Sequence, residues 1–177
     1  GPVFTFTLGA PPPAPARPRL GPGANPTPSH TAMFDKILTL CTGNICRSPL
    51  AEFLLRDRLA ARGRAATVAS AGIGALVGHP ADETTQRVAL RHGIDLSPHV
   101  ARQLTPEITR WADLILVMEK HHLEYATRLD PSARGKIFLL GHWDKAEVPD
   151  PYRLAEENHQ LAYDIIAHTA EQWIGKL

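Results

Sequence analysis

The stretch that most constrains this chain is Cys41-Thr-Gly-Asn-Ile-Cys-Arg-Ser-Pro49. It follows a short apolar run, Lys36-Ile-Leu-Thr-Leu-Cys41, and precedes a long amphipathic segment that ends at Gly63. This order predicts a buried strand, a loop and a helix. A loop that enters a helix N-terminus presents backbone amides and the positive end of the helix dipole to an anion. The sequence therefore predicts a phosphate-binding loop with a thiol at its first position.

The loop also carries the groups needed to transfer a phosphoryl group. Cys41 can attack phosphorus as a thiolate, which the helix N-terminus and a nearby cation both favour. Arg47 can hold two phosphate oxygens with its planar guanidinium, and Ser48 can donate a hydrogen bond to the sulfur. Asp150 lies between two prolines and precedes Tyr152, which makes it the candidate general acid and base. Taken alone, an Asp before a proline can equally be a turn former.

Composition predicts one domain and a tail. Nine of the sixteen prolines lie in residues 1–32, and the opening Gly-Pro resembles a protease-cleavage scar, so we expect this segment to be cloning-derived or disordered. Residues 33–177 carry 17 basic and 18 acidic residues, which argues against a nucleic-acid partner. The chain shows no long apolar run and no signal peptide, so we expect no membrane insertion and a cytoplasmic location. Two cysteines five positions apart suit a reducing compartment.

Strands alternate with helices along the rest of the chain. The predicted fold class is α/β, with a single-domain, four-stranded parallel sheet covered by helices on both faces. In such sheets ligands bind at the carboxyl ends of the strands, where Cys41 is expected to lie. The predicted strands span residues 36–41, 67–71, 113–118 and 136–140, and the main helices begin at Ser48-Pro49, Asp82, Thr105-Pro106, Glu119 and Ala155.

Several residues receive simpler interpretations. Ser48 suits the N-cap of the first long helix, and His121 and His122 read as solvated helix surface. The histidines are scattered and the two cysteines lack partners with zinc-site spacing, so we expect no metal site and no cofactor. Cys46 can be a core-facing thiol. Alternatively, it can form a reversible disulfide with Cys41 that protects the nucleophile from over-oxidation.

These residues resemble the low-molecular-weight protein tyrosine phosphatases over nearly all of residues 36–174. The likeness is closest to the bacterial branch associated with exopolysaccharide and capsule export. The motifs that carry it are Cys41-Thr-Gly-Asn-Ile-Cys-Arg-Ser-Pro49, Ser70-Ala-Gly72, Gly74-Ala-Leu-Val-Gly78, His99-Val-Ala-Arg102, Met118-Glu119, Arg134-Gly-Lys136, Gly141-His-Trp-Asp144 and Asp150-Pro-Tyr152.

The resemblance implies hydrolysis of phosphotyrosine in proteins through a phosphocysteine intermediate. It assigns Cys41 as nucleophile, Arg47 as phosphate clamp and Asp150 as general acid and base. The partner it implies is an autophosphorylated tyrosine kinase of polysaccharide export, and we expect a monomer or weak dimer. The resemblance places the phosphate-binding or loop-supporting roles on Thr42, Gly43, Asn44, Ile45, Cys46, Ser48 and His99, and the aryl slot between Leu76 and Tyr152.

Three alternatives stay open. Arsenate reductases on the same scaffold also begin with a Cys-x5-Arg loop, but they need further resolving cysteines, and the chain has none after Cys46. Phosphoarginine phosphatases resemble this loop but carry threonine where Ile45 stands, so the aliphatic side chain favours phosphotyrosine. A non-catalytic phosphotyrosine-binding module would need neither a loop thiol nor a downstream Asp-Pro.

Overall fold

Four parallel strands form the centre of the domain, and their order in the sheet is β2-β1-β3-β4. The computed structural model describes residues 34–177, so the predicted tail lies outside the described residues. All residues of β2 and β3 are buried, as are all but the first of β1, because helices cover both sides of the sheet. The strands are β1 (Lys36–Cys41), β2 (Thr67–Gly72), β3 (Leu114–Val117) and β4 (Ile137–Leu139).

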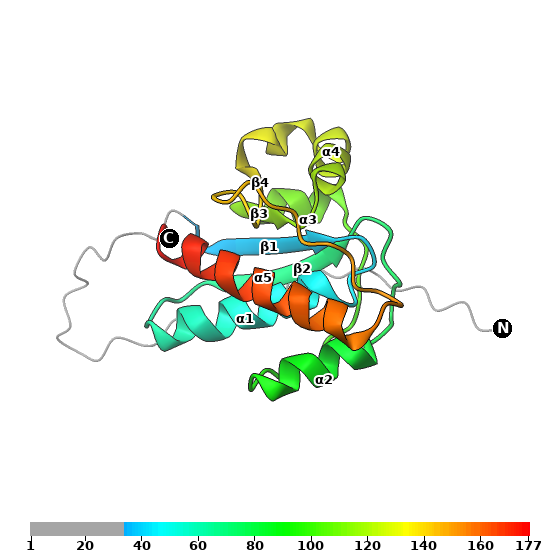
Figure 1. Ribbon diagram of the computed structural model, residues 1–177. Coiled ribbons are helices and arrows are strands. Elements are labelled where there is room, and N and C mark those ends of the chain that lie inside the picture. The colour runs from blue at the N-terminus through cyan, green and yellow to red at the C-terminus, as the bar shows by residue number, and fades with distance from the viewer. Residues whose placement is uncertain (1–33) are drawn as a thin grey trace.

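The helices divide between the two faces of the sheet (Figure 1). Residues of α1, α2 and α5 share one apolar cluster with one face of the strands. Residues of α3, α4 and a short 3-10 helix share a second cluster with the opposite face. The predicted α/β architecture is therefore confirmed. The helices are α1 (Arg47–Ala61), α2 (Glu83–Arg91), α3 (Pro106–Trp111), α4 (Lys120–Leu129), η1 (Pro131–Lys136) and α5 (Glu156–Ile174).

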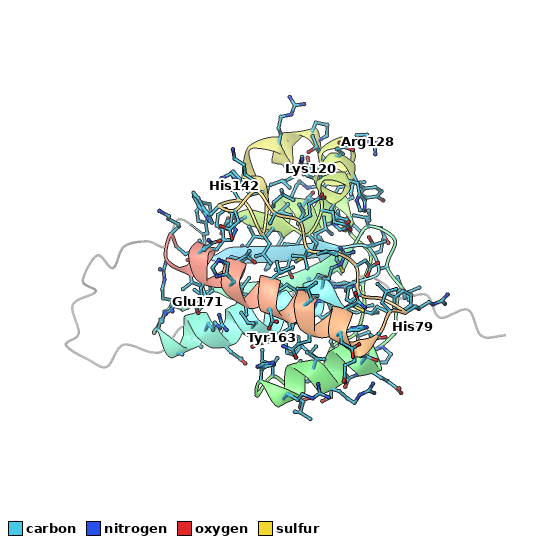
Figure 2. The ribbon with its side chains drawn as sticks, in the orientation of Figure 1. His79, Lys120, Arg128, His142, Tyr163 and Glu171 are labelled. Atoms are coloured by element: carbon cyan, nitrogen blue, oxygen red, sulfur yellow. The ribbon has the colours of Figure 1, made fainter. Side chains whose placement is uncertain are left out.

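The long C-terminal helix α5 packs against both α1 and α2 on one face of the sheet. Figure 2 shows Glu171 on α5 beside α1, where its carboxylate accepts hydrogen bonds from Arg58 at 2.8 Å and Arg62 at 2.7 Å. Tyr163 of α5 stacks on His92, the C-cap residue that follows α2, with ring centroids 3.8 Å apart. Because α5 contacts both α1 and α2, side chains from all three can meet behind the phosphate loop.

The start of α1 differs from the prediction. The helix begins at Arg47, and its N-cap is Cys46, whose side chain makes no capping hydrogen bond. Ser48 is therefore not the N-cap; its hydroxyl turns instead toward the Cys41 sulfur. Two other predicted helix starts are confirmed, and their first residues cap the helices, because Asp82 accepts from the Thr85 amide and Thr105 from the Ile108 amide.

The strand ends hold the phosphate loop closely. A Cβ added at Gly72, the last residue of β2, would lie 2.4 Å from the Thr42 carbonyl oxygen and 3.0 Å from the Asn44 amide. Only glycine permits this approach, so the end of β2 supports the loop from below. Within residues 34–177, no helix is long and apolar enough to cross a membrane.

Candidate active site

A cavity of about 150 Å³ opens at the carboxyl end of β1. The loop runs around it from Cys41, the last residue of β1, to Arg47, the first residue of α1. The cavity brings the three predicted catalytic side chains together with both residues of the predicted aryl slot. Its lining comprises Cys41, Thr42, Gly43, Ile45, Cys46, Arg47, Gly74, Leu76, Asp150 and Tyr152.

Asn44 holds the loop in shape from beneath the cavity. Its backbone is left-handed, with φ of 57°, and its side chain is fully buried. The Asn44 Oδ1 accepts from the Arg102 amide at 2.9 Å, while Nδ2 donates to Ser48 Oγ at 2.8 Å and Ser70 Oγ at 2.9 Å. These bonds fix a conformation that few side chains adopt, which agrees with the loop-supporting role expected of Asn44.

His99 supports the same turn through its ring. Its Nε2 lies 2.6 Å from the Asn44 carbonyl oxygen. A carbonyl oxygen only accepts, so Nε2 carries the hydrogen and donates it. Burial lowers the pKa of His99 below its ordinary value, opposed by that hydrogen bond and by the Glu52 carboxylate. A neutral imidazole still provides this donor, so the bond persists without a charge on the ring.

Ser48 is placed to stabilise the nucleophile. Its Oγ lies 2.9 Å from the Cys41 sulfur and accepts one hydrogen bond from Asn44. That bond occupies a lone pair of the hydroxyl and leaves its hydrogen free to point at sulfur. The alternative acceptor, the Ala71 carbonyl, is 3.4 Å away. Because Cys41 is only 2 % exposed, this donor replaces solvation that a thiolate would otherwise lack.

Hydrogen bonds to one side of the Arg47 guanidinium fix its orientation. The Nη1 group donates to Glu119 Oε2 at 2.7 Å and to the Val148 carbonyl at 2.8 Å. Nη2 lies 3.7 Å from Asp150 Oδ2. With Nη1 committed to the protein, the edge formed by Nε and Nη2 is the one offered to a phosphate. Glu119 thus acts as a positioning residue for the clamp, which sequence reasoning saw only as part of a family motif.

His122 corrects the sequence interpretation, because it is fully buried and not solvated surface. Its Nδ1 accepts from the Glu119 amide at 3.0 Å, so Nε2 carries the hydrogen that joins it to Thr42 Oγ1 at 2.9 Å. Burial lowers the pKa of His122 to about 3, helped by the nearby Arg47 charge. The spacing of Glu119 and His122, three apart at the start of α4, is the capping-box signal that could have revealed it.

The buried neutral state of His122 predicts a pH-dependent stability. The folded pKa of about 3 lies below the unfolded value of 6.5, so between these values the unfolded chain binds more protons. The contribution of the neutral His122 to the free energy of unfolding is therefore fully present above pH 6.5 and is lost as the pH falls toward 3. We expect His122→Asn to reduce this slope by up to about 1.4 kcal/mol per pH unit in urea unfolding from pH 4 to 7. His79→Asn, at an exposed site, is the matched control, and an unchanged slope in His122→Asn would contradict the assignment.

The position of Asp150 is compatible with both roles that the sequence left open. Its Oδ1 accepts from the Tyr152 amide at 3.0 Å, as a turn former does, while Oδ2 faces Arg47. The side chain is 47 % exposed, so a leaving group entering the cavity can reach it. Tyr152 and Leu76 pack beside Ile45 and form the apolar part of the wall.

Cys46 is buried in the same loop. Both cysteines of the chain are free thiols, and the reversible disulfide between them stays a hypothesis. Burial raises the pKa of Cys46 to about 12, although the Thr85 hydroxyl partly offsets the effect. Cys46 is therefore a protonated thiol at neutral pH.

The site and fold match one family throughout. Residues 36–177 match the family described as low molecular weight phosphotyrosine protein phosphatase. The chain belongs to this family. Over 146 residues it is 45 % identical to a probable low molecular weight protein-tyrosine-phosphatase, AmsI, of Erwinia amylovora, covering 82 % of this chain and 99 % of the relative. It is 46 % identical over 142 residues to Wzb of Escherichia coli K12, covering 80 % and 94 %.

Solved structures agree with the family. Wzb of Escherichia coli K30 in complex with sulphate superposes with a TM-score of 0.77 at 46 % identity, covering 81 % of this chain and 98 % of that one. A YwlE arginine phosphatase with a phosphorylated active-site serine is 28 % identical, with a TM-score of 0.76, covering 80 % and 95 %. The chain is thus a protein-tyrosine phosphatase, a hydrolase, of the exopolysaccharide-associated branch that includes AmsI, Etp and Wzb. Its substrates are phosphotyrosine proteins.

Proposed function

We propose that Cys41 attacks the phosphorus of a protein phosphotyrosine. An S–P bond forms as the bond between phosphorus and the tyrosine oxygen breaks. Asp150, entering protonated, gives its proton to that oxygen, while Arg47 and the loop amides hold the phosphoryl oxygens. The observation that carries this proposal is the single cavity in which Cys41, Arg47 and Asp150 meet an aromatic wall.

The second step returns the enzyme to its starting state. Asp150, now a carboxylate, takes a proton from water as that water attacks the phosphocysteine. The S–P bond breaks, inorganic phosphate leaves, and Cys41 is again a thiolate held by Ser48. The phosphorylated active-site serine of the related YwlE variant supports a covalent intermediate at this position of the loop.

An aryl phosphate fits this cavity better than a short alkyl phosphate. Cys41 is almost entirely buried, so the phosphate must reach inward past the rim. A tyrosine ring is long and flat enough to do this while packing between Leu76 and Tyr152. A phosphoserine would have to bring its peptide backbone into the cavity. The depth of the cavity and its apolar wall therefore favour phosphotyrosine as the substrate class.

The biological setting follows from the branch of the family. We propose as substrate an autophosphorylated tyrosine kinase of polysaccharide export, acting with this enzyme in the cytoplasm. We also propose that the enzyme works as a monomer or weak dimer, because Cys41, Arg47 and Asp150 all line the cavity of one chain.

Phosphoarginine is the rival substrate, because a 28 % identical relative is described as an arginine phosphatase. Ile45 lines the cavity and is 7 % exposed, so its side chain faces the incoming group. We expect turnover of a phosphotyrosine peptide to exceed that of the matched phosphoarginine peptide by at least about tenfold, since an apolar wall offers no partner to a guanidinium. Release of inorganic phosphate measures both.

Ile45→Thr sharpens this test. The hydroxyl adds a polar partner at the wall, so the preference for phosphotyrosine should shrink while the fold is retained. Leu161→Thr, an exposed apolar site on α5, is the control and should leave the preference unchanged. Equal or higher turnover of phosphoarginine by the unmodified enzyme would overturn the proposed specificity.

A further inference from the structure

Three side chains with metal-ligating atoms meet behind the phosphate loop. Cys46 comes from the loop, Asp82 caps the start of α2, and His159 lies near the start of α5. Their sulfur, carboxylate oxygen and imidazole nitrogen lie within 4.8 Å of one another. Cys46 and His159 are buried, and the three residues are brought together only because α2 and α5 pack side by side (Figure 1).

Thr85 links His159 to Asp82, and a small cavity lies beside Cys46 and His159. The Thr85 hydroxyl is 2.9 Å from His159 Nδ1, and the Thr85 amide donates to Asp82 Oδ2 at 3.0 Å. The cavity, of about 10 Å³, is lined by Cys46, Thr85 and His159 among others. This is about the volume that one water molecule occupies, and a small cation needs no more.

We propose that Cys46, Asp82 and His159 form a binding site for Zn²⁺, with the Thr85 hydroxyl or a water as fourth ligand. Zinc binds sulfur at about 2.3 Å and nitrogen or oxygen at about 2.0 Å, so in a tetrahedral site the nitrogen and oxygen ligands stand about 3.3 Å apart and the sulfur about 3.5 Å from either. His159 Nδ1 and Asp82 Oδ2 stand 3.8 Å apart, and the Cys46 sulfur lies within 4.8 Å of both. Closing these gaps requires each of the three side chains to move by roughly 1 Å or less.

The donor set selects for a thiophilic cation. A thiol, an imidazole and a carboxylate suit Zn²⁺, whereas Mg²⁺ and Ca²⁺ prefer oxygen ligands alone. Binding releases the Cys46 proton to solvent as the Zn–S bond forms. The charged groups facing His159 are the carboxylates of Asp82, Asp150 and Glu156, against Arg87. Arg47, which lines the small cavity, is paired with Glu119.

A second cluster of possible metal ligands is less suited to binding zinc. Glu119, His121 and His122 also bring ligand atoms together. However, His122 uses both ring nitrogens in hydrogen bonds that hold the phosphate site, and Glu119 is paired with Arg47. That cluster belongs to the catalytic machinery. The site at Cys46 shares only that residue with the lining of the phosphotyrosine cavity, because Asp82 and His159 lie outside it, and the proposal does not depend on the proposed reaction.

A bound Zn²⁺ would change the chemistry of the loop. It would hold Cys46 as a metal-bound thiolate directed toward α5, so that this sulfur could neither be alkylated nor pair with an oxidised Cys41.

The test uses the full chain carrying Cys41→Ser, which removes zinc binding at the nucleophile. Titration with ZnCl₂ by calorimetry should show a site that Asp82→Asn and His159→Phe each weaken at least about tenfold. Asp82→Asn preserves the helix cap, and His159→Phe preserves the volume, so circular dichroism should remain unchanged. MgCl₂ should produce no binding. The proposal would be overturned if both variants bound zinc as tightly as the Cys41→Ser protein, or if the Cys41→Ser protein bound no zinc.

Cys46 itself provides a second measurement. In the same background it is the only cysteine, so its alkylation by iodoacetamide under mild urea can be followed by intact mass. ZnCl₂ should slow that alkylation at least about tenfold, and His159→Phe should abolish the protection. Protection that persists in His159→Phe would place the metal elsewhere and refute the site.

Discussion

Replacing Cys41 with serine is expected to abolish hydrolysis of p-nitrophenyl phosphate, lowering kcat by at least about a thousandfold. A serine hydroxyl is far less ionised than a thiol near neutral pH and is a poorer nucleophile toward phosphorus. The substitution keeps the hydrogen-bond partner of Ser48 and changes the side chain by one atom, so the loop should keep its shape. The loss then reports chemistry and not folding.

Two further measurements separate a lost nucleophile from a damaged loop. The Cys41→Ser protein should still be stabilised against heat by inorganic phosphate, because the loop amides and Arg47 remain. Mass spectrometry after incubation with a phosphotyrosine protein should reveal either a stable complex or a phosphorylated serine. Wild-type inactivity toward p-nitrophenyl phosphate, or a variant that retains more than about a tenth of wild-type kcat, would refute the nucleophile assignment.

The fold could be predicted because its signals are local. Four of the six residues from Lys36 to Cys41 are apolar, and Asp82 and Thr105 mark helix starts directly in the sequence. The position of Cys41 at the end of β1 then follows from a general rule for parallel sheets. The prediction that Ser48 is an N-cap was wrong. A serine before proline favours an N-cap locally, but the Ser48 hydroxyl lies within hydrogen-bond distance of the Cys41 sulfur instead.

The side chains that hold the phosphate loop and Arg47 in place could not be predicted in the same way. The spacing of Glu119 and His122 signals the capping box, but the burial of His122 against Thr42 depends on the position of α4 over the loop. The Arg47 contact with Val148 joins residues 101 positions apart. Likewise Cys46 and His159 are distant in sequence, so the spacing rules that argued against a metal site could not detect their approach.

Asp150 should behave as an acid and not merely as a turn residue, and two substitutions distinguish the roles. Asn at this position can still accept the Tyr152 amide through Oδ1, so Asp150→Asn keeps the turn but cannot give a proton. Asp150→Ala loses both. If proton transfer matters, both variants lose about 10² to 10⁴ in kcat. If only the turn matters, Asp150→Asn stays close to wild type. Asp144→Asn, an exposed site whose side chain accepts from Gln172 of α5, is the matched control.

The pH profile and the leaving group complete this argument. The first step needs Asp150 protonated and Cys41 ionised at once, so wild-type kcat/KM should peak on the acidic side of neutrality and fall toward alkaline pH. Asp150→Asn has no proton to lose at this position, so its profile should lack the alkaline fall. Its deficit should also grow with aryl phosphates whose phenols are poorer leaving groups, because these depend most on protonation. A wild-type rate that climbs steadily into the alkaline range, or a deficit independent of the phenol, would show that protonation by Asp150 does not limit the reaction.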